Sequence, residues 1–255
     1  MADPATLLTY DDDLVAGTIV DRPNRFVVRV RFDSGSSDGE SERVYLPDPG
    51  ELDGIVEPGN EILCTPIDDP GRATAYDAIA VNVGSQCVSV RAALANDLFE
   101  RMLERDLLPS FSDCSIVRRE PPLPDHGRTD FLLESPAGAP VYVEVKSCTS
   151  VERGVARFPD RPTERGRRHL RSLESLVSDG TACTIVFVVQ RSDAERFRPF
   201  DTVDPEFAEL LARVHETGVG VQAVTTAFDP TADSPRYALR DPNLPVALDF
   251  TAESP

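Results

Sequence analysis

The sequence predicts a two-part α/β (α+β) protein, with a small N-terminal β-barrel followed by a larger domain around a central mixed sheet. Short strand-like segments separated by turn formers fill the first part of the chain. Helical and strand-like periodicities then alternate, which is typical of helices that cover a sheet. A length of 255 residues accommodates two such domains, and we expect them at residues 1–85 and 86–255.

The chain is strongly acidic, with a formal net charge of −18 and 44 Asp and Glu residues. Its hydrophobic content of 40% argues against disorder. High salt screens the mutual repulsion of so many carboxylates. We therefore expect a soluble protein from a halophilic, archaeal source.

Nothing in the sequence indicates a membrane or secretory protein. No apolar run has the length of a membrane span, and the N-terminal residues 1–4 lack a basic, apolar signal pattern. Five cysteines are scattered without C-x-x-C spacing, which favours reduced thiols over a zinc site. The expected location is the cytoplasm.

The first domain has the strand and turn pattern of a small barrel. Strand-like segments lie at 14–20, 26–32, 43–46 and 61–65, with turns at 22–24, 47–50 and 57–60 and a polar loop at 34–39. This density of short strands indicates an OB-like barrel. Such barrels often bind nucleic acid on one face, although a purely structural β-domain fits the pattern equally well.

The second domain alternates helices with strands. A leucine and methionine stripe predicts a helix at 92–108, and Glu100 on this helix could reach a nearby site. A proline-rich loop at 118–127 leads into a β-hairpin formed by 129–133 and 141–147. A helix begins near Pro162, a strand buried on both faces covers 183–190, and a helix and a strand follow at 205–217 and 219–224. Gln190 ends the buried strand, where it could join the site.

The register of the hairpin can be predicted from its apolar faces. Pairing Phe131 with Val143 keeps the apolar side chains on one face, and a slip by one residue would expose them. This register places Asp130 opposite Glu144, on the face that also carries Lys146. Two carboxylates this close repel each other unless a cation lies between them, and Mg²⁺ takes such ligands.

Lys146 stands out because every other Lys or Arg position in the chain is an arginine. Lys and Arg together number 26, and Lys146 is the only lysine, so the other 25 are arginine. A Glu-x-Lys pair on a strand is most often a solvated ion pair. The opposed Asp130 and the single lysine favour a functional site.

A locally basic segment follows the hairpin. Residues 152–171 hold seven arginines against three acidic residues. Arginines beside a helix N-terminus bind phosphate well, although they could also simply neutralise an acidic surface. The candidate nucleic-acid-binding residues are Arg128, Arg157, Arg165, Arg167, Arg168 and His169.

These motifs resemble the sugar fermentation stimulation protein A family. The similarity covers most of the chain and also extends through the strand that ends at Gln190 and the helix that follows Asp204. The segments that carry it are Arg128-Thr129-Asp130-Phe131-Leu132-Leu133, Tyr142-Val143-Glu144-Val145-Lys146-Ser147, Phe158-Pro159-Asp160, Thr163-Glu164-Arg165-Gly166 and His169-Leu170.

The resemblance implies an OB-like domain followed by a restriction-endonuclease-like domain of the PD-(D/E)xK nucleases. It implies Asp130, Glu144 and Lys146 as the nuclease-type triad, with Glu100 as an additional helical carboxylate. The Val145 carbonyl would join Asp130 and Glu144 in holding Mg²⁺ or Mn²⁺. The turn at 47–50 departs from the family's Pro-Asn-Thr-Gly pattern, and Thr129 stands where the nuclease motif often has proline.

Two functions follow as hypotheses. The first is a DNA-binding nuclease that hydrolyses phosphodiester bonds with Mg²⁺. The second is a non-catalytic DNA-binding regulator of sugar metabolism genes. In either case the expected partner is nucleic acid, DNA in particular, and a homodimer is one conceivable assembly.

Overall fold

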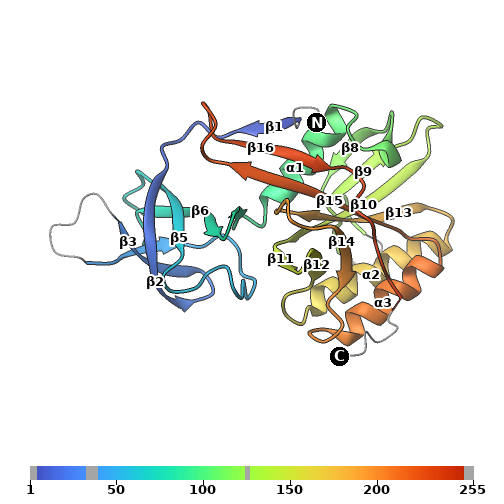
Figure 1. Cartoon of the computed structure of the whole chain (residues 1–255). Coiled ribbons are helices and arrows are strands. Elements are labelled where there is room, and N and C mark those ends of the chain that lie inside the picture. The colour runs from blue at the N-terminus through green and yellow to red at the C-terminus, as the bar shows by residue number, and fades with distance from the viewer. Residues whose placement is uncertain (1–4, 33–39, 124–126, 250–255) are drawn as a thin grey trace.

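The computed structural model of the chain describes residues 5–32, 40–123 and 127–249. Figure 1 shows a small β-barrel beside a larger domain in which helices flank a long sheet. Among the described residues, none of the helices combines the length and the apolar composition that a membrane span needs.

The N-terminal domain is a closed five-stranded barrel with one additional strand. The strand order is β4-β3-β2-β5-β6-β7, and a parallel pairing of β4 with β6 closes the barrel. Fully buried valine and isoleucine side chains fill its interior. The predicted OB-like barrel is therefore confirmed. Its strands are β2 (Val15–Asn24), β3 (Val27–Phe32), β4 (Glu42–Tyr45), β5 (Glu61–Pro66), β6 (Tyr76–Val83) and β7 (Gln86–Ser89).

The first hairpin of the barrel turns later than the sequence predicted. β2 continues through residues 22–24, and the turn is formed by Arg25 and Phe26. Pro23 is tolerated inside the strand because the β2–β3 register shifts between Asp21 and Asn24, as at a bulge. The predicted polar loop at 34–39 lies outside the described residues.

The second domain is built on a seven-stranded mixed sheet, as predicted. The order is β1-β16-β15-β13-β10-β9-β8, in which β10, β13 and β15 are parallel and the outer pairings are antiparallel. Its strands are β1 (Thr6–Thr9), β8 (Ser115–Arg119), β9 (Phe131–Glu134), β10 (Pro140–Cys148), β13 (Ala182–Val189), β15 (Gly220–Asp229) and β16 (Arg236–Asp241).

The barrel begins and ends at other positions in the chain than the expected bounds of residues 1 and 85. β1 pairs with β16, so the chain starts in the sheet of the second domain before it enters the barrel. β7 lies beyond residue 85 but pairs with β6 of the barrel. Both pairings give hydrogen-bond partners to the N–H and C=O groups of strand edges that would otherwise be exposed. The β1 pairing joins segments more than 200 residues apart, and local sequence patterns carry no signal for it.

Helices cover both faces of the large sheet (Figure 1). Alternate residues of β13 divide between two cores: Val186 and Val188 pack with α1, while Phe187 packs with α2 and α3. The prediction that this strand is buried on both faces is confirmed. The helices are α1 (Leu94–Glu104), α2 (Glu164–Ser178) and α3 (Pro205–Glu216), with a short 3₁₀ helix η1 (Pro109–Phe111).

The part of the basic segment that precedes α2 contains two short strands, where we expected the arginines to lie on a loop and the first helical turns. β11 and β12 form a hairpin whose turn residues Arg153 and Gly154 have positive φ angles. β12 then pairs in parallel with β14, a contact that only the folded chain creates. The three strands of this small sheet are β11 (Ser150–Glu152), β12 (Val155–Phe158) and β14 (Arg196–Pro199).

The two domains meet where the turn at 47–50 packs against the end of β12. The Leu52 amide donates to Asp160 Oδ2 at 3.2 Å, and Arg161 Nη1 donates to the Pro49 carbonyl at 3.1 Å. Position 50 favours glycine because a Cβ there would overlap Asp160 Oδ2 and lie 3.1 Å from Asp48 Oδ1. The absence of this Cβ allows the domains to touch.

We predict that Gly50→Ala lowers the melting temperature, because the methyl group must displace Asp160. Overpacking of this kind destabilises by about 1–3 kcal/mol. Gly71→Ala is the matched control, since its Cβ would meet only the flexible carboxylate of Asp69, at 3.2 Å. Thermal denaturation in high KCl measures both variants, and equal melting temperatures would contradict a tight domain contact.

Candidate active site

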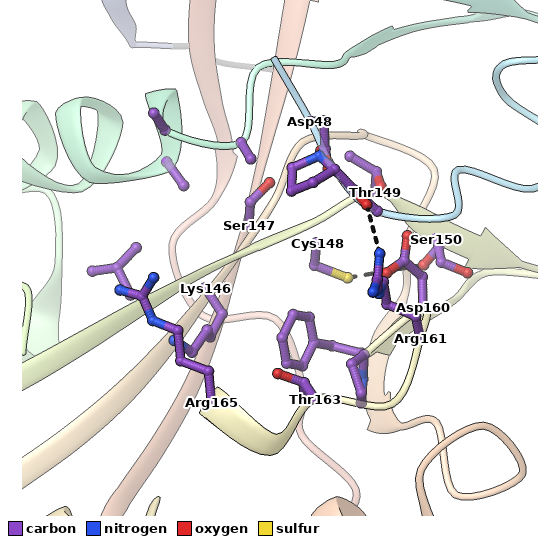
Figure 2. Close-up of a pocket in the computed structure, with 18 of the residues that line it drawn as sticks. Asp48, Lys146, Ser147, Cys148, Thr149, Ser150, Asp160, Arg161, Thr163 and Arg165 are labelled. Carbon is purple, nitrogen blue, oxygen red and sulfur yellow. Dashed lines mark hydrogen bonds between the residues drawn. The ribbon is translucent and has the colours of Figure 1, made fainter. Parts of the chain in front are cut away.

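A pocket of about 720 Å³ opens between the barrel and the second domain. It lies at the C-terminal end of β10, the end of parallel strands where ligands bind in α/β sheets. Figure 2 shows Lys146 and Arg165 toward one end, and Asp48, Asp160 and Arg161 toward the other. Asp130 and Glu144 also line this pocket, so the structure brings the predicted carboxylates and the lysine together.

The predicted hairpin register is confirmed, and it positions Asp130. Phe131 pairs with Val143, and β10 then continues beyond the start of β9. The edge of β10 next to Asp130 is therefore not covered by β9. Asp130 Oδ2 accepts a hydrogen bond from the Val145 amide at 2.8 Å, and Oδ1 accepts one from Asn96 Nδ2 of α1 at 3.0 Å.

Glu144 is almost completely buried, with 2% exposure, and is held from three directions. Its Oε1 is in contact with both Lys146 Nζ and His169 Nδ1. Thr129 Oγ1 lies 2.9 Å from Oε2 and 2.8 Å from the Val143 carbonyl, so these two acceptors share one hydroxyl proton. The carboxylate thus connects β10 to α2 and to the residue before Asp130.

The two carboxyl groups have opposite electrostatic environments. Burial raises the pKa of Asp130, and the negative charge of Glu144 raises it further. Burial also opposes ionisation of Glu144, but Lys146 and His169 outweigh it and lower the pKa of Glu144 to about 2. Glu144 is therefore the firmly ionised member of the pair, and Asp130 is the one that a nearby cation would stabilise.

The acceptor atoms suit a hard divalent cation. Each carboxylate oxygen has about two lone pairs, and Oδ1 and Oδ2 of Asp130 each accept only one hydrogen bond. Oε2 of Glu144 likewise keeps one acceptor position. The Val145 carbonyl faces the same strand edge as its amide, toward Asp130. Mg²⁺ often uses one or two carboxylates and completes its shell with water and phosphate.

The described residues contain no cluster of three His, Cys, Asp or Glu side chains able to hold a metal. Glu100 was expected as an additional carboxylate, but it forms an ion pair with Arg119 of β8 and does not line the pocket. Asn96, one helical turn earlier on the same face of α1, reaches Asp130 in its place. Any metal site here would therefore rest on Asp130 and Glu144.

Gln190 lies behind the pocket and does not line it. Its Nε2 donates to Ser147 Oγ at 2.8 Å and to the Arg91 carbonyl at 3.2 Å. Ser147 itself lines the pocket. Gln190 therefore positions the chain after Lys146, which is a more indirect role than the sequence predicted.

Two of the predicted nucleic-acid-binding residues form their contacts inside the domain. Arg167 forms ion pairs with the buried Asp204 at 2.6 Å and with Glu164 and Glu206, so it links α2 to the start of α3. His169 is 4% exposed and contacts Glu144. Because their polar groups are engaged inside the protein, neither is available on the surface that the sequence predicted.

The remaining basic candidates are distributed over different surfaces. Arg157 and the exposed Arg165 line the pocket. Arg168 is also exposed on α2 but does not line it. Arg128 is exposed and pairs with Glu120 at 3.2 Å.

The structure adds Asn96, Asp48 and Asp160 to the site. Asn96 could have been found from sequence, since it lies four residues before Glu100 on a predicted helix. Burial raises the pKa of Asp48 to about 6, and the charge of Asp160 acts in the same direction. No local pattern signals this pair, because the two aspartates come from different domains.

Glu144→Gln should change how stability depends on pH. The folded state holds the pKa of Glu144 near 2 against an ordinary value of 4.5, so it binds fewer protons than the unfolded state in this range. The stability that this ionised group contributes is complete above about pH 5 and is lost as the pH falls toward 2. That contribution corresponds to about 3 kcal/mol.

We therefore expect the difference in unfolding free energy between wild type and Glu144→Gln to shrink as the pH is lowered. Denaturant titrations in high KCl with EDTA measure it. Glu209→Gln is the control, because Glu209 is exposed on α3. A difference that stays constant down to about pH 3 would contradict the assigned environment of Glu144.

Comparison with known proteins places this architecture in a family. Residues 20–90 match the family model described as SfsA N-terminal OB domain, and residues 93–232 match the model described as Sugar fermentation stimulation protein RE domain. The matches agree with an OB-like barrel followed by a restriction-endonuclease-like domain.

Individual related proteins support the same family assignment. The sugar fermentation stimulation protein homologue of Methanothermobacter thermautotrophicus is 37% identical over 239 residues, covering 94% of this chain and 95% of the relative. The Halorhodospira halophila homologue is 37% identical and covers 91% and 97%. A solved structure, Pyrococcus furiosus SfsA in complex with Ca²⁺, has a TM-score of 0.83 at 30% identity and covers 95% of this chain and 99% of that one. The chain belongs to the sugar fermentation stimulation protein family.

Proposed function

We propose that this protein is a divalent-metal-dependent nuclease that hydrolyses phosphodiester bonds of DNA. The observation that carries the proposal is the convergence of Asp130, Glu144 and the chain's only lysine in one pocket. Lys146 and Arg165 supply positive charge at the same end of this pocket. Carboxylates beside basic groups are the combination that a metal-assisted attack on phosphate requires.

Asp130, Glu144 and the Val145 carbonyl are the groups that would hold Mg²⁺ or Mn²⁺. The related Pyrococcus protein was solved in complex with Ca²⁺, which supports a divalent cation here. When bound, the cation would neutralise charge on the phosphate and make a water molecule more acidic.

The protein's own groups then orient the reactants. Lys146 Nζ contacts Glu144 Oε1 and is 15% exposed toward the pocket, so it can donate to an attacking water or to a phosphate oxygen. Arg165 lies exposed at the first turn of α2 and would hold a backbone phosphate. His169 and Thr129 keep the Glu144 carboxylate in place.

A non-catalytic DNA-binding regulator of sugar metabolism genes is the alternative. It is favoured by the occupied Oε1 of Glu144, which already contacts both Lys146 and His169. The engagement of Glu100 by Arg119 also leaves the pocket with fewer metal ligands than expected. Cleavage and metal binding discriminate between the two functions.

The strongly acidic composition leads us to propose a cytoplasmic protein adapted to high salt. Assays should accordingly be carried out in concentrated KCl. An overall charge of −18 also opposes DNA, so we expect the affinity to be weak and non-specific.

Metal binding is the first test. Calorimetry with Mn²⁺ should show one site per chain in the wild type and none in Asp130→Ala or Glu144→Ala. Glu100→Gln is the matched control and should bind normally, because its carboxylate pairs with Arg119. Binding that persists in either of the first two variants would place the metal elsewhere.

The substitution Lys146→Arg tests catalysis. Arginine is larger, tends to bind carboxylates in a bidentate manner and does not release its proton, so it should compete with the metal and fail as a compact donor. Because Lys146 lines the pocket, the longer side chain has room, and we expect an unchanged melting temperature in high KCl. Cleavage should fall at least tenfold, which corresponds to about 1.4 kcal/mol of transition-state stabilisation.

Single-turnover cleavage of labelled DNA with Mn²⁺ measures this effect, with wild type and variant side by side. Equal rates would reject a catalytic role for Lys146. Absence of cleavage by the wild type with Mg²⁺ and with Mn²⁺ would favour the regulator.

A further inference from the structure

The pocket continues past the carboxylates into the contact between the two domains. The barrel contributes Arg25, Asp48 and Pro49 to its wall, and the second domain contributes Arg157 and Asp160. The Leu52 to Asp160 and Arg161 to Pro49 hydrogen bonds hold the two walls together. The candidate catalytic groups therefore open into a bounded pocket between the domains.

Arg157 lines this part of the pocket and has one donor without a partner. Its guanidinium lies 5.2 Å from the centre of the Phe200 ring, which supports one of its faces. Its Nε is buried without a hydrogen-bond partner, and no carboxylate of the described chain forms an ion pair with it. The guanidinium lines the pocket and forms no ion pair with a described carboxylate, so it can bind a phosphate there.

The barrel carries an exposed aromatic ring, Phe26, which follows the pocket-lining Arg25 in the sequence. Phe26 is 39% exposed, and Val117 is the only other exposed large hydrophobic residue in the described ranges. Arg25, which lines the pocket, lies with its guanidinium carbon 4.8 Å from the centre of the Phe26 ring. The Asn24 side chain accepts from the Phe26 amide at 2.9 Å and fixes this turn. Exposed aromatic rings next to arginine are typical platforms for stacking unpaired bases.

We propose that this pocket binds a single nucleic-acid strand between the two domains, with a phosphate on Arg157 and an unpaired base stacked on Phe26. The inference rests on the proposed nuclease function, because the strand would lead to Asp130 and Glu144. A volume of about 720 Å³ is in the range of pockets for small molecules, so it suits one or two nucleotides. Stacking on Phe26 likewise requires a base that is not paired.

The acidic pair in the pocket fits bases better than phosphates. Asp48 and Asp160 lie together toward the domain contact and would repel a phosphate placed beside them. A carboxylate readily accepts hydrogen bonds from the amino groups of base edges. In the proposed arrangement these aspartates face the bases of the strand, while Arg157 and Arg165 contact its backbone.

Fluorescence anisotropy in a KCl series with EDTA tests the proposal without cleavage. The probes are a labelled oligo-dT strand and a labelled blunt hairpin duplex of similar length. We expect the wild type to bind the single strand about tenfold more tightly than the duplex, because stacking of a base on an aromatic ring contributes that much or more. Phe26→Ala should remove most of this preference, and Arg157→Gln should reduce the salt slope for the single strand by about 0.7.

Two matched variants control for hydrophobicity and charge. Val117→Ala truncates the other exposed apolar side chain, and Arg168→Gln removes a charge on α2 that does not line the pocket. Both should keep the single-strand preference, and melting temperatures verify that all variants fold. Equal affinity of the wild type for both probes, or an unchanged preference in Phe26→Ala, would overturn the proposal.

The outcome is separable from that of the nuclease proposal. Cleavage of DNA without single-strand preference would leave the nuclease function intact and reject the single-strand pocket. Single-strand preference without cleavage by the wild type under either metal would support the pocket and reject the nuclease.

Discussion

The pairing of β9 with β10 is the constraint on which the candidate site depends. Their register aligns Phe131 with Val143 and the pairing ends there, so beyond Val143 one edge of β10 is not covered by β9. Asp130 uses that edge to accept from the Val145 amide, and Glu144 projects to the face covered by α2. A shift of one residue would invert both side chains and bury polar groups in the apolar core.

Glu144 then connects this hairpin to the rest of the domain. A carboxylate with 2% exposure is tolerated only when donors surround it, and here they come from Lys146, His169 and Thr129. Removing one partner of such a buried pair is far more destabilising than breaking an exposed ion pair. The same arrangement keeps Glu144 ionised and leaves Asp130 as the carboxyl that a cation would stabilise.

The interface between the domains turns this sheet edge into a pocket. Without the barrel, the end of β10 and the start of α2 would face solvent. The close approach of Gly50 to Asp160 closes one side of the pocket, and the two arginines Arg25 and Arg157 face it from different domains. A bounded space of this kind strengthens electrostatic interactions because it excludes part of the solvent.

The barrel, the mixed sheet, the three helices and the register that pairs Phe131 with Val143 could all be predicted from the sequence. These features follow from apolar periodicity of two or 3.6 residues, which is a local property. The pairing of β1 with β16, the inward contacts of Arg167 and His169, and the ion pair of Glu100 with Arg119 could not be predicted in this way. The fold also brings Asp48 next to Asp160. In each case the partner comes from a distant segment, and a charged side chain has the same local pattern whether it faces solvent, a ligand or a buried counter-ion.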